Sequence, residues 1–193
     1  RRYKDDLIEY GELRNAIVHN RGGGHTIAEP HLEAVESIEK IRDLIEKPPK
    51  VFPLFKINVL SFDIHDSIGN AVKIMTEGSF SQVPITNDGK FKALLTANTI
   101  LRWLGSNVDE DIFSLKETTI GQVLNFTEDP ENIHFVSRNT TLFKALEFFD
   151  DFEKRGKRLE ALLITDSGNQ NEKIIGIITI ADFPKLLREI TFK

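Results

Sequence analysis

The sequence predicts an α+β protein: two β-α-β-β-α repeats packed as a pseudo-twofold pair, preceded by a helical hairpin. The first observation is a repeated motif. Thr179-Ile180-Ala181-Asp182 has a counterpart 83 residues earlier, Thr96-Ala97-Asn98-Thr99, and each follows an apolar, strand-like run. The second is a repeated helical stripe with i, i+3, i+4, i+7 spacing, over residues 68–75 and again over 142–149. Such internal repetition is typical of a tandem fold with two related clefts.

Residues 1–47 are predicted to form the helical hairpin. One helix covers residues 3–20 and ends at Asn20-Arg21-Gly22-Gly23-Gly24, because glycine commonly stops a helix. A second covers residues 30–47. The residues expected to face inward are Leu7, Tyr10, Leu13 and Ile17 in the first helix, and Ala34, Ile38, Ile41 and Ile45 in the second. Pro48-Pro49 cannot continue a helix, so residues 48–56 are interpreted as a stiff, proline-rich linker.

The first repeat, with its following linker, is assigned to residues 57–119. The predicted elements are a strand at 57–62, a helix at 66–77, strands at 82–86 and 91–96, and a helix at 97–105. Asn87-Asp88-Gly89-Lys90 between the last two strands is a strong hairpin signal. Residues 106–119 link the repeats and carry the acidic run Asp109-Glu110-Asp111.

The second repeat is assigned to residues 120–193 and follows the same order. Its predicted elements are strands at 133–137, 160–165 and 174–179, and helices at 141–155 and 180–191. Pro184 is tolerated there, because amides in the first turn of a helix need no partner within the helix. Each repeat alone would leave a sheet face uncovered, so we expect the pair to be the folding unit.

The composition restricts the class of protein. The chain has 193 residues, a net charge of −5 and no cysteine. The charge argues against a broad nucleic-acid surface, although a local basic patch is compatible with it. The lack of cysteine excludes disulfides and thiolate chemistry and fits a reducing compartment, so we expect a cytoplasmic protein. No apolar run could span a bilayer and no membrane partner is expected. Because the chain begins Arg1-Arg2-Tyr3, we expect it to be part of a longer protein.

The ordered pattern resembles the tandem CBS domain pair, often called a Bateman module, over residues 57–191. Gln82-Val83-Pro84-Ile85-Thr86 is similar to the family's apolar-Pro-Val-Val strand. Gly176-Ile177-Ile178-Thr179-Ile180-Ala181-Asp182 is similar to its more specific motif, in which a small residue and an apolar run precede Thr/Ser-x-x-Asp. The resemblance implies a regulatory module that binds an adenine nucleotide, with no catalytic cofactor.

In this family the Asp of the motif typically binds a ribose diol and the Thr reaches the phosphate, which implies these roles for Asp182 and Thr179. An ionised carboxylate can accept both diol protons, and the free amides of a helix start suit phosphate oxygens. The resemblance places the adenine against two strands: Phe135, Val136 and Ser137, and Ala161, Leu162 and Leu163. Sequence does not choose among AMP, ADP, ATP and S-adenosylmethionine.

A structural alternative exists for the same motif, because Thr-x-x-Asp is also a common capping box at a helix start. The two copies also differ. Thr99 stands where the second copy has Asp182, and Ala93 where it has Gly176. Because the first copy lacks the carboxylate and has an added methyl group at the strand, we expect the first cleft to bind a ligand weakly or to be empty.

The N-terminal helix carries a further signal. Arg14-Asn15-Ala16-Ile17-Val18-His19 resembles the Arg-Asn-x-x-x-His motif of HEPN proteins, helical bundles that include metal-independent ribonucleases. Asn15 and His19 are four residues apart and share a helix face. The resemblance implies a partial HEPN element, with Arg14, Asn15 and His19 as the only candidate catalytic residues. His19, His25 and His31 lack a strong metal-binding spacing, so no metal site is predicted.

Three functions remain open at this point. The leading interpretation is a regulatory module, not an enzyme, that senses an adenine nucleotide and signals to the attached helices. The alternatives are a fragment of a HEPN-type ribonuclease regulated by the CBS pair, and a dimerisation module without a ligand. A homodimer is expected, because Trp103 and Leu104 look like apolar residues that one pair would leave uncovered.

Overall fold

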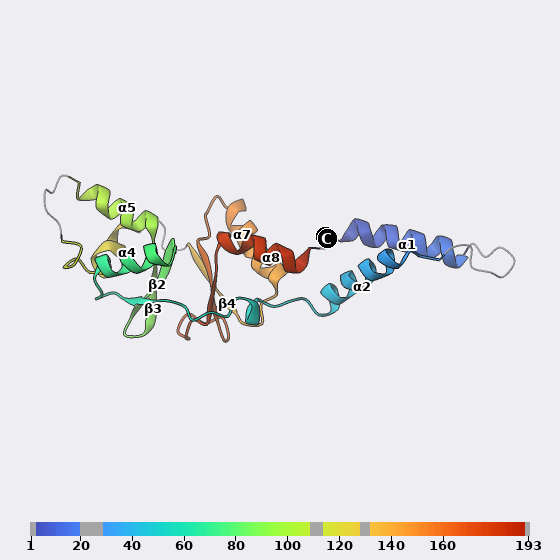
Figure 1. Cartoon of the computed structure of the whole chain (residues 1–193), viewed down its shortest axis with the longest axis horizontal. Coiled ribbons are helices and arrows are strands. Elements are labelled where there is room, and N and C mark those ends of the chain that lie inside the picture. Colours follow the sequence, from blue (N-terminus) through green and yellow to red (C-terminus); the bar gives the residue numbers. More distant parts are fainter. Residues whose placement is uncertain (1–2, 20–28, 109–113, 128–131, 192–193) are drawn as a thin grey trace. The chain divides into compact units, whose positions relative to one another are not determined.

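The structure, a computed structural model, describes residues 3–19, 29–108, 114–127 and 132–191. It contains two three-stranded sheets with helices (Figure 1), which confirms the predicted α+β class. The chain divides into two compact units, one made of Arg1–Pro49 with Leu186–Lys193 and the other of Lys50–Lys185. The predicted helix stop at residues 20–24, the acidic run 109–111 and His25 lie outside the described residues.

The first unit contains the predicted hairpin helices, α1 (Lys4–His19) and α2 (Leu32–Glu46). Their predicted inward faces are less covered than expected. Helix α1 has no buried residue, and in α2 Ile41 is buried at 2% exposure whereas Ile45 is 58% exposed. The hydroxyl of Tyr3 donates a hydrogen bond to the carbonyl of Ile190. The hairpin therefore leaves much of its apolar surface in contact with solvent.

The first repeat begins with three strands and two helices in the predicted order, but its first strand is Phe62–Asp63 and not the predicted 57–62. They are β1 (Phe62–Asp63), α4 (Ile68–Glu77), β2 (Gln82–Asn87), β3 (Lys90–Thr96) and α5 (Ala97–Ser106). Strand β2 is central, parallel to β1 and antiparallel to β3. Asp88 and Gly89 have φ angles of 51° and 75°. Two successive positive φ angles are the signature of a type I′ hairpin turn, as the Asp-Gly pair predicts.

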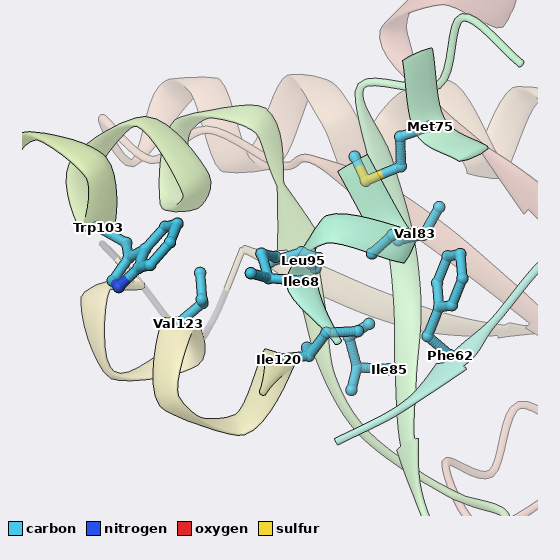
Figure 2. Packing of buried hydrophobic residues seen from close by; sticks show 10 residues of the cluster. Phe62, Ile68, Met75, Val83, Ile85, Leu95, Trp103, Ile120 and Val123 are labelled. Atoms are coloured by element: carbon cyan, nitrogen blue, oxygen red, sulfur yellow. The ribbon is translucent and has the colours of Figure 1, made fainter. Parts of the chain in front are cut away.

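The core of the first repeat includes a segment assigned to the second repeat from the sequence. Helix α6 (Ile120–Val123) and the 3₁₀ turn η1 (Leu124–Phe126) follow the linker, and Ile120 and Val123 are fully buried. Figure 2 shows both side chains among those of Ile68, Leu95 and Trp103. We therefore place residues 120–126 with the first repeat.

The position of Trp103 differs from the uncovered position that the sequence analysis expected for it. Its side chain is only 5% exposed, and Leu104 packs against the same core. Neither residue supplies the uncovered surface on which the predicted homodimer was based.

The second repeat is built the same way. Its elements are β4 (Ile133–Ser137), α7 (Leu142–Lys154), β5 (Ala161–Thr165), β6 (Gly176–Ile178), the 3₁₀ turn η2 (Ile180–Asp182) and α8 (Phe183–Ile190). Strand β5 is central, parallel to β4 and antiparallel to β6. The predicted final helix thus begins as a 3₁₀ turn, with Thr179 as its N-cap residue.

The predicted linker is part of the second repeat. The segment Lys50–Ile57 contains the short helix α3 (Val51–Leu54). It forms hydrogen bonds with that repeat near its start, its middle and its end. Val51 N–H donates to the carbonyl of Thr140 at 2.8 Å. Further along, Lys56 forms an antiparallel bridge with Gly176. The segment that precedes the first repeat therefore extends the sheet of the second. We call residues 50–57 the crossing segment.

The two repeats are joined by polar and apolar contacts. Gln82 Nε2 donates to the carbonyl of Glu160 at 2.8 Å. Phe91 meets Phe135 edge to face, with ring centroids 5.1 Å apart. Leu94 packs with Ala161 and Leu163, also buried. Within the described residues, no helix is long and apolar enough to cross a membrane.

Candidate ligand-binding site

The motif at the end of β6 forms the capping box that its sequence allows. Asp182 Oδ2 accepts hydrogen bonds from the Thr179 backbone N–H at 2.8 Å and from the Thr179 hydroxyl at 3.2 Å. Both residues are only partly buried. The second carboxylate oxygen, Oδ1, makes no hydrogen bond to any residue that the structure describes. Since a carboxylate can accept about four hydrogen bonds, the capping role leaves Asp182 able to bind a ligand as well.

Thr99, the equivalent of Asp182 in the first repeat, is not accessible to a ligand. Thr99 N–H donates to Thr96 Oγ1 at 3.1 Å, and the two hydroxyl groups lie 3.0 Å apart. Thr96 is 8% exposed and Thr99 is 2% exposed. Thr99 therefore has neither a charge nor an accessible hydroxyl to offer, which agrees with the expected inequality of the two clefts. Whether either cleft binds a ligand stays a prediction.

Gly176 is needed for a reason other than the one inferred from the sequence. A Cβ atom at this position would lie 2.3 Å from the carbonyl oxygen of Phe55 and 3.0 Å from Ile164 Cδ1. The close neighbour is thus the protein's own crossing segment. Ala93 is the counterpart of Gly176, and it pairs with Ile85 within the first sheet.

Lys185 is tied to the same segment. Its Nζ donates to the carbonyl of Leu54 at 2.8 Å and lies 4.8 Å from the centre of the Phe55 ring. Lys185 lies one helical turn after Asp182. The crossing segment and the candidate site are consequently linked through the start of α8.

The strands predicted to hold an adenine are mostly interior. Ala161, Leu162 and Leu163 are fully buried, and Val136 is 3% exposed. Because β5 pairs on both sides, its backbone groups are already hydrogen-bonded within the sheet. Phe135 and Ser137, on the edge strand β4, are partly exposed. Of the two strands, β4 offers the more accessible groups, and its role in ligand binding stays a prediction.

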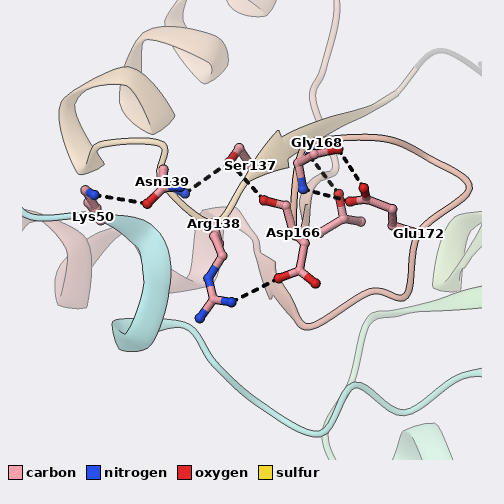
Figure 3. A network of polar contacts seen from close by, with 9 residues as sticks. Lys50, Ser137, Arg138, Asn139, Asp166, Gly168 and Glu172 are labelled. Carbon is pink, nitrogen blue, oxygen red and sulfur yellow. Dashed lines mark hydrogen bonds and ion pairs between the residues drawn. The ribbon is translucent and has the colours of Figure 1, made fainter.

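A polar network follows β4 that the sequence did not reveal. Arg138 Nη1 pairs with Asp166 at 3.0 Å, and its guanidinium lies 4.0 Å from the centre of the Phe52 ring. Figure 3 shows this pair beside the hydrogen bond from Lys50 to Asn139, which measures 3.0 Å. The stacking of Arg138 on Phe52 and the Lys50–Asn139 hydrogen bond hold the crossing segment against the end of β4. Their residues are far apart in sequence, so no local motif announces them.

The loop after β5 is ordered by a carboxylate. Glu172 accepts from the backbone N–H of Ser167 at 2.7 Å and from its hydroxyl at 2.6 Å. These two bonds hold the pKa of Glu172 below its ordinary value, and the bond from the Ser167 hydroxyl has the larger effect. Gly168, at a φ of 92°, donates its N–H to Thr165 Oγ1 at 2.9 Å. The loop thus has a defined shape at the carboxyl end of β5.

The candidate catalytic residues of α1 are exposed and lie close together in sequence. Arg14 Nη1 donates to Asn15 Oδ1 at 3.1 Å, and His19 is the last residue of the helix. A small groove of about 230 Å³ beside Arg14 is otherwise lined by Tyr10, by apolar residues of both helices and by Pro30, which precedes α2. Across the described residues, no group of three or more His, Asp or Glu side chains could hold a metal ion.

Comparison with known families decides what the two repeats are. The model of the CBS domain matches residues 41–106 and 128–189, which is more than half of the chain. The chain belongs to the CBS domain family. The match begins within α2, so α1 with Arg14, Asn15 and His19 lies outside it, and the HEPN resemblance was not recovered. No match was found among curated proteins.

Solved structures share the fold of this CBS pair. CbpB in complex with c-di-AMP is 16% identical, with a TM-score of 0.54 over 81% of this chain and 97% of that one. The CBS domain pair of MJ0100, in complex with 5′-methylthioadenosine and S-adenosyl-L-methionine, is 15% identical, with a TM-score of 0.54 over 75% and 99%. CBSX2 in complex with AMP is 16% identical, with a TM-score of 0.52 over 74% and 98%. At these identities the likeness concerns the fold alone.

Proposed function

We propose that this CBS pair is a regulatory module that binds an adenine nucleotide beside Thr179 and Asp182 and passes the signal to the attached helices. The observation that carries the proposal is the difference between the two motif ends. Asp182 is partly exposed and keeps one carboxylate oxygen available, whereas Thr99 is buried and bonded to its own motif. The proposed ligand is of the AMP, ADP or ATP class.

The chemistry of Asp182 suits a ribose. A vicinal diol presents two hydroxyl donors, and a carboxylate accepts both in charge-assisted hydrogen bonds. AMP, 5′-methylthioadenosine and S-adenosylmethionine, which occupy two of the three related structures named above, all carry this diol; c-di-AMP, in the third, keeps only the 2′-hydroxyl of each ribose. They share adenosine and differ in phosphate content, which supports adenosine as the common recognised part. The proposal includes no catalytic step.

The crossing segment supports the signalling part of the proposal. The chain continues from α2 through Pro48-Pro49 directly into Lys50. Lys185, one turn after Asp182, binds the segment at Leu54. A ligand that shifts the start of α8 would change this bond, and such a ligand is regulatory if it favours one arrangement of the segment over another.

A homodimer in the cytoplasm completes the proposal. The exposed apolar side chains of the hairpin support self-association, among them Leu7 at 40% and Leu13 at 42% exposure. Sedimentation equilibrium at tens of micromolar should give about twice the 22.0 kDa chain mass. A single 22.0 kDa species would contradict the dimer and leave the nucleotide site unaffected.

The test of the nucleotide site is calorimetric titration of the full chain with AMP, ADP, ATP and S-adenosylmethionine. The informative variant is Asp182→Asn, because the amide oxygen can still accept from Thr179 while the charge is lost. We expect affinity to fall on the order of tenfold or more, the range for a charge-assisted bond.

The matched control is Asp88→Asn, which makes the same chemical change in the exposed hairpin turn of the first repeat. Asn is favoured at a positive φ, so folding should be preserved. Equal affinity of wild type, Asp182→Asn and Asp88→Asn for every ligand would remove Asp182 from the site. No saturable binding of any ligand would refute the nucleotide proposal.

A further inference from the structure

A second cleft, of about 860 Å³, runs along the edge strand β4. Neither Thr179 nor Asp182 lines it. Its walls come from the start of β3, from β4, from the end of α7 and from the loop after β5, and include Phe91, Lys92, Phe135, Phe152, Arg155 and Lys157. The volume is within the range of small-molecule sites, about 300–1,000 Å³. We call this the basic cleft.

The charge of the basic cleft is opposite to that of the chain. Lys92, Arg155 and Lys157 converge on it, and no Asp or Glu is among its described lining residues, although the whole chain carries −5. Lys92 and Arg155 form no ion pair with any residue that the structure describes. A concave site lined by one sign of charge concentrates ions of the other sign.

Local rules explain these cations only one at a time. Arg155 is the C-cap residue of α7, where the helix dipole favours a cation. Lys92 lies in an edge strand, where lysine prevents pairing with other chains. Neither rule explains why cations from both repeats lie at the same cleft. Binding of an anionic ligand between the repeats would explain it.

The wall beside the cations is aromatic. Phe91 and Phe135 form their edge-to-face pair here, and His134 stacks against Phe148 with ring centroids 4.2 Å apart. Phe152 also borders the cleft, 6.4 Å from His134 between centroids. Such a surface suits a planar, apolar group rather than a bare ion.

Amide groups complete the lining. Gln170 and Asn171 border the cleft from the loop that Glu172 and Gly168 hold in shape. Asn171 N–H is bonded to Asn169 Oδ1 at 2.9 Å, so the loop also has internal order. Side-chain amides can donate to phosphate oxygens or to the edge of a base. The cleft thus combines cations, a planar wall and neutral donors.

We propose that the basic cleft is a second, separate binding site for a nucleoside triphosphate, which it holds mainly by the phosphate chain. Lys92 and Arg155 contact the phosphates from opposite repeats, and the base lies against the aromatic wall. The Asp182 site recognises adenosine and needs no phosphate, whereas the basic cleft needs phosphates and no particular base. Occupancy of the basic cleft would draw the start of β3 toward the end of α7.

The test uses three probes in calorimetric titrations of the full chain at low salt: inorganic tripolyphosphate, UTP and uncharged 5′-methylthioadenosine. We expect tripolyphosphate to bind and UTP to bind more tightly. The double variant Lys92→Gln/Arg155→Gln should weaken both on the order of tenfold or more, because two charge-assisted contacts are lost. Lys73→Gln, an exposed lysine of α4 outside the cleft, is the matched control and should leave both affinities unchanged.

The probes separate this site from the proposed adenosine site. Asp182→Asn should weaken binding of 5′-methylthioadenosine on the order of tenfold or more and leave the affinity for tripolyphosphate unchanged. Absence of saturable tripolyphosphate and UTP binding, or equal weakening by Lys73→Gln, would overturn the basic-cleft proposal even if 5′-methylthioadenosine binds. Equal affinities for tripolyphosphate and UTP would overturn the assignment of a nucleoside triphosphate. Melting temperatures of all variants within about 2 °C of wild type confirm that folding is intact.

Discussion

The substitution Gly176→Ala tests whether the crossing segment belongs to the sheet of the second repeat. An added Cβ would lie 2.3 Å from Phe55 O, against 3.4 Å for an ordinary contact, so the segment would have to retreat by about 1 Å. Ile164 Cδ1, at 3.0 Å, closes the other side. The retreat would strain the Lys56 bridge and the bond from Ile57 N–H to Ile175 O, which is already 3.4 Å long.

The expected cost of this change is about 2–4 kcal/mol. Overpacking a filled site costs about 1–3 kcal/mol, and each weakened backbone hydrogen bond adds about 0.5–1.5 kcal/mol. Urea unfolding followed by circular dichroism measures the loss as a lower midpoint. Amide exchange should accelerate at Ile57 before the core of the first repeat is affected.

Two controls accompany Gly176→Ala. Gly105→Ala adds the same methyl group to an exposed position of α5 with nothing within 4 Å, and should stabilise the protein by about 0.5–1 kcal/mol. Ala93→Gly, at the equivalent strand position of the first repeat, should cost about 0.5–1 kcal/mol through chain entropy. If Gly176→Ala unfolds at the wild-type midpoint, the crossing segment does not pack as described.

Other parts of the structure give three more expectations. Thr99→Asp should lower the melting temperature without creating a second 5′-methylthioadenosine site, because the side chain is 2% exposed; two equivalent sites at an unchanged melting temperature would contradict the closed first cleft. The pKa of His134 is lowered by burial and by a nearby lysine, so its contribution to stability is complete above its ordinary pKa of 6.5 and is lost as pH falls through the lower folded value. His134→Gln should therefore flatten the fall in melting temperature between about pH 7.5 and 5.5, and identical pH profiles would refute this. Arg138→Ala should cost about 1 kcal/mol, since it removes an exposed ion pair with Asp166 and the stacking on Phe52; an unchanged urea midpoint would show that neither contact stabilises the fold.

Local sequence patterns were sufficient to predict those elements whose structure depends on neighbouring residues alone. The Asp88-Gly89 turn and the apolar stripes of α4 and α7 follow from φ preferences and helical periodicity, and all were predicted correctly. Strand β4 has the predicted bounds, Ile133–Ser137. These features need no information from elsewhere in the chain.

The features that the sequence did not predict depend on distant contacts. Trp103 looked exposed because the residues that cover it, in the α6 region, come after a linker. Gly176 was assigned to a ligand because its true neighbour, Phe55, is more than a hundred residues away in sequence. The basic cleft combines Lys92 with Arg155, which no periodicity connects. Pairings across long sequence separations are set by the fold as a whole.

The crossing segment also determines how the chain can be divided. A fragment that begins at the first strand of the first repeat would leave the β6 edge without its cover, and an uncovered edge is prone to pair with other molecules. A fragment of the second repeat alone would lack the same cover. Limited proteolysis between residues 49 and 58 should therefore leave a peptide that stays bound until the second repeat unfolds. A second repeat joined to a different partner would likewise need a replacement for this segment, which is supplied from outside the repeat and bridges its sheet at Gly176.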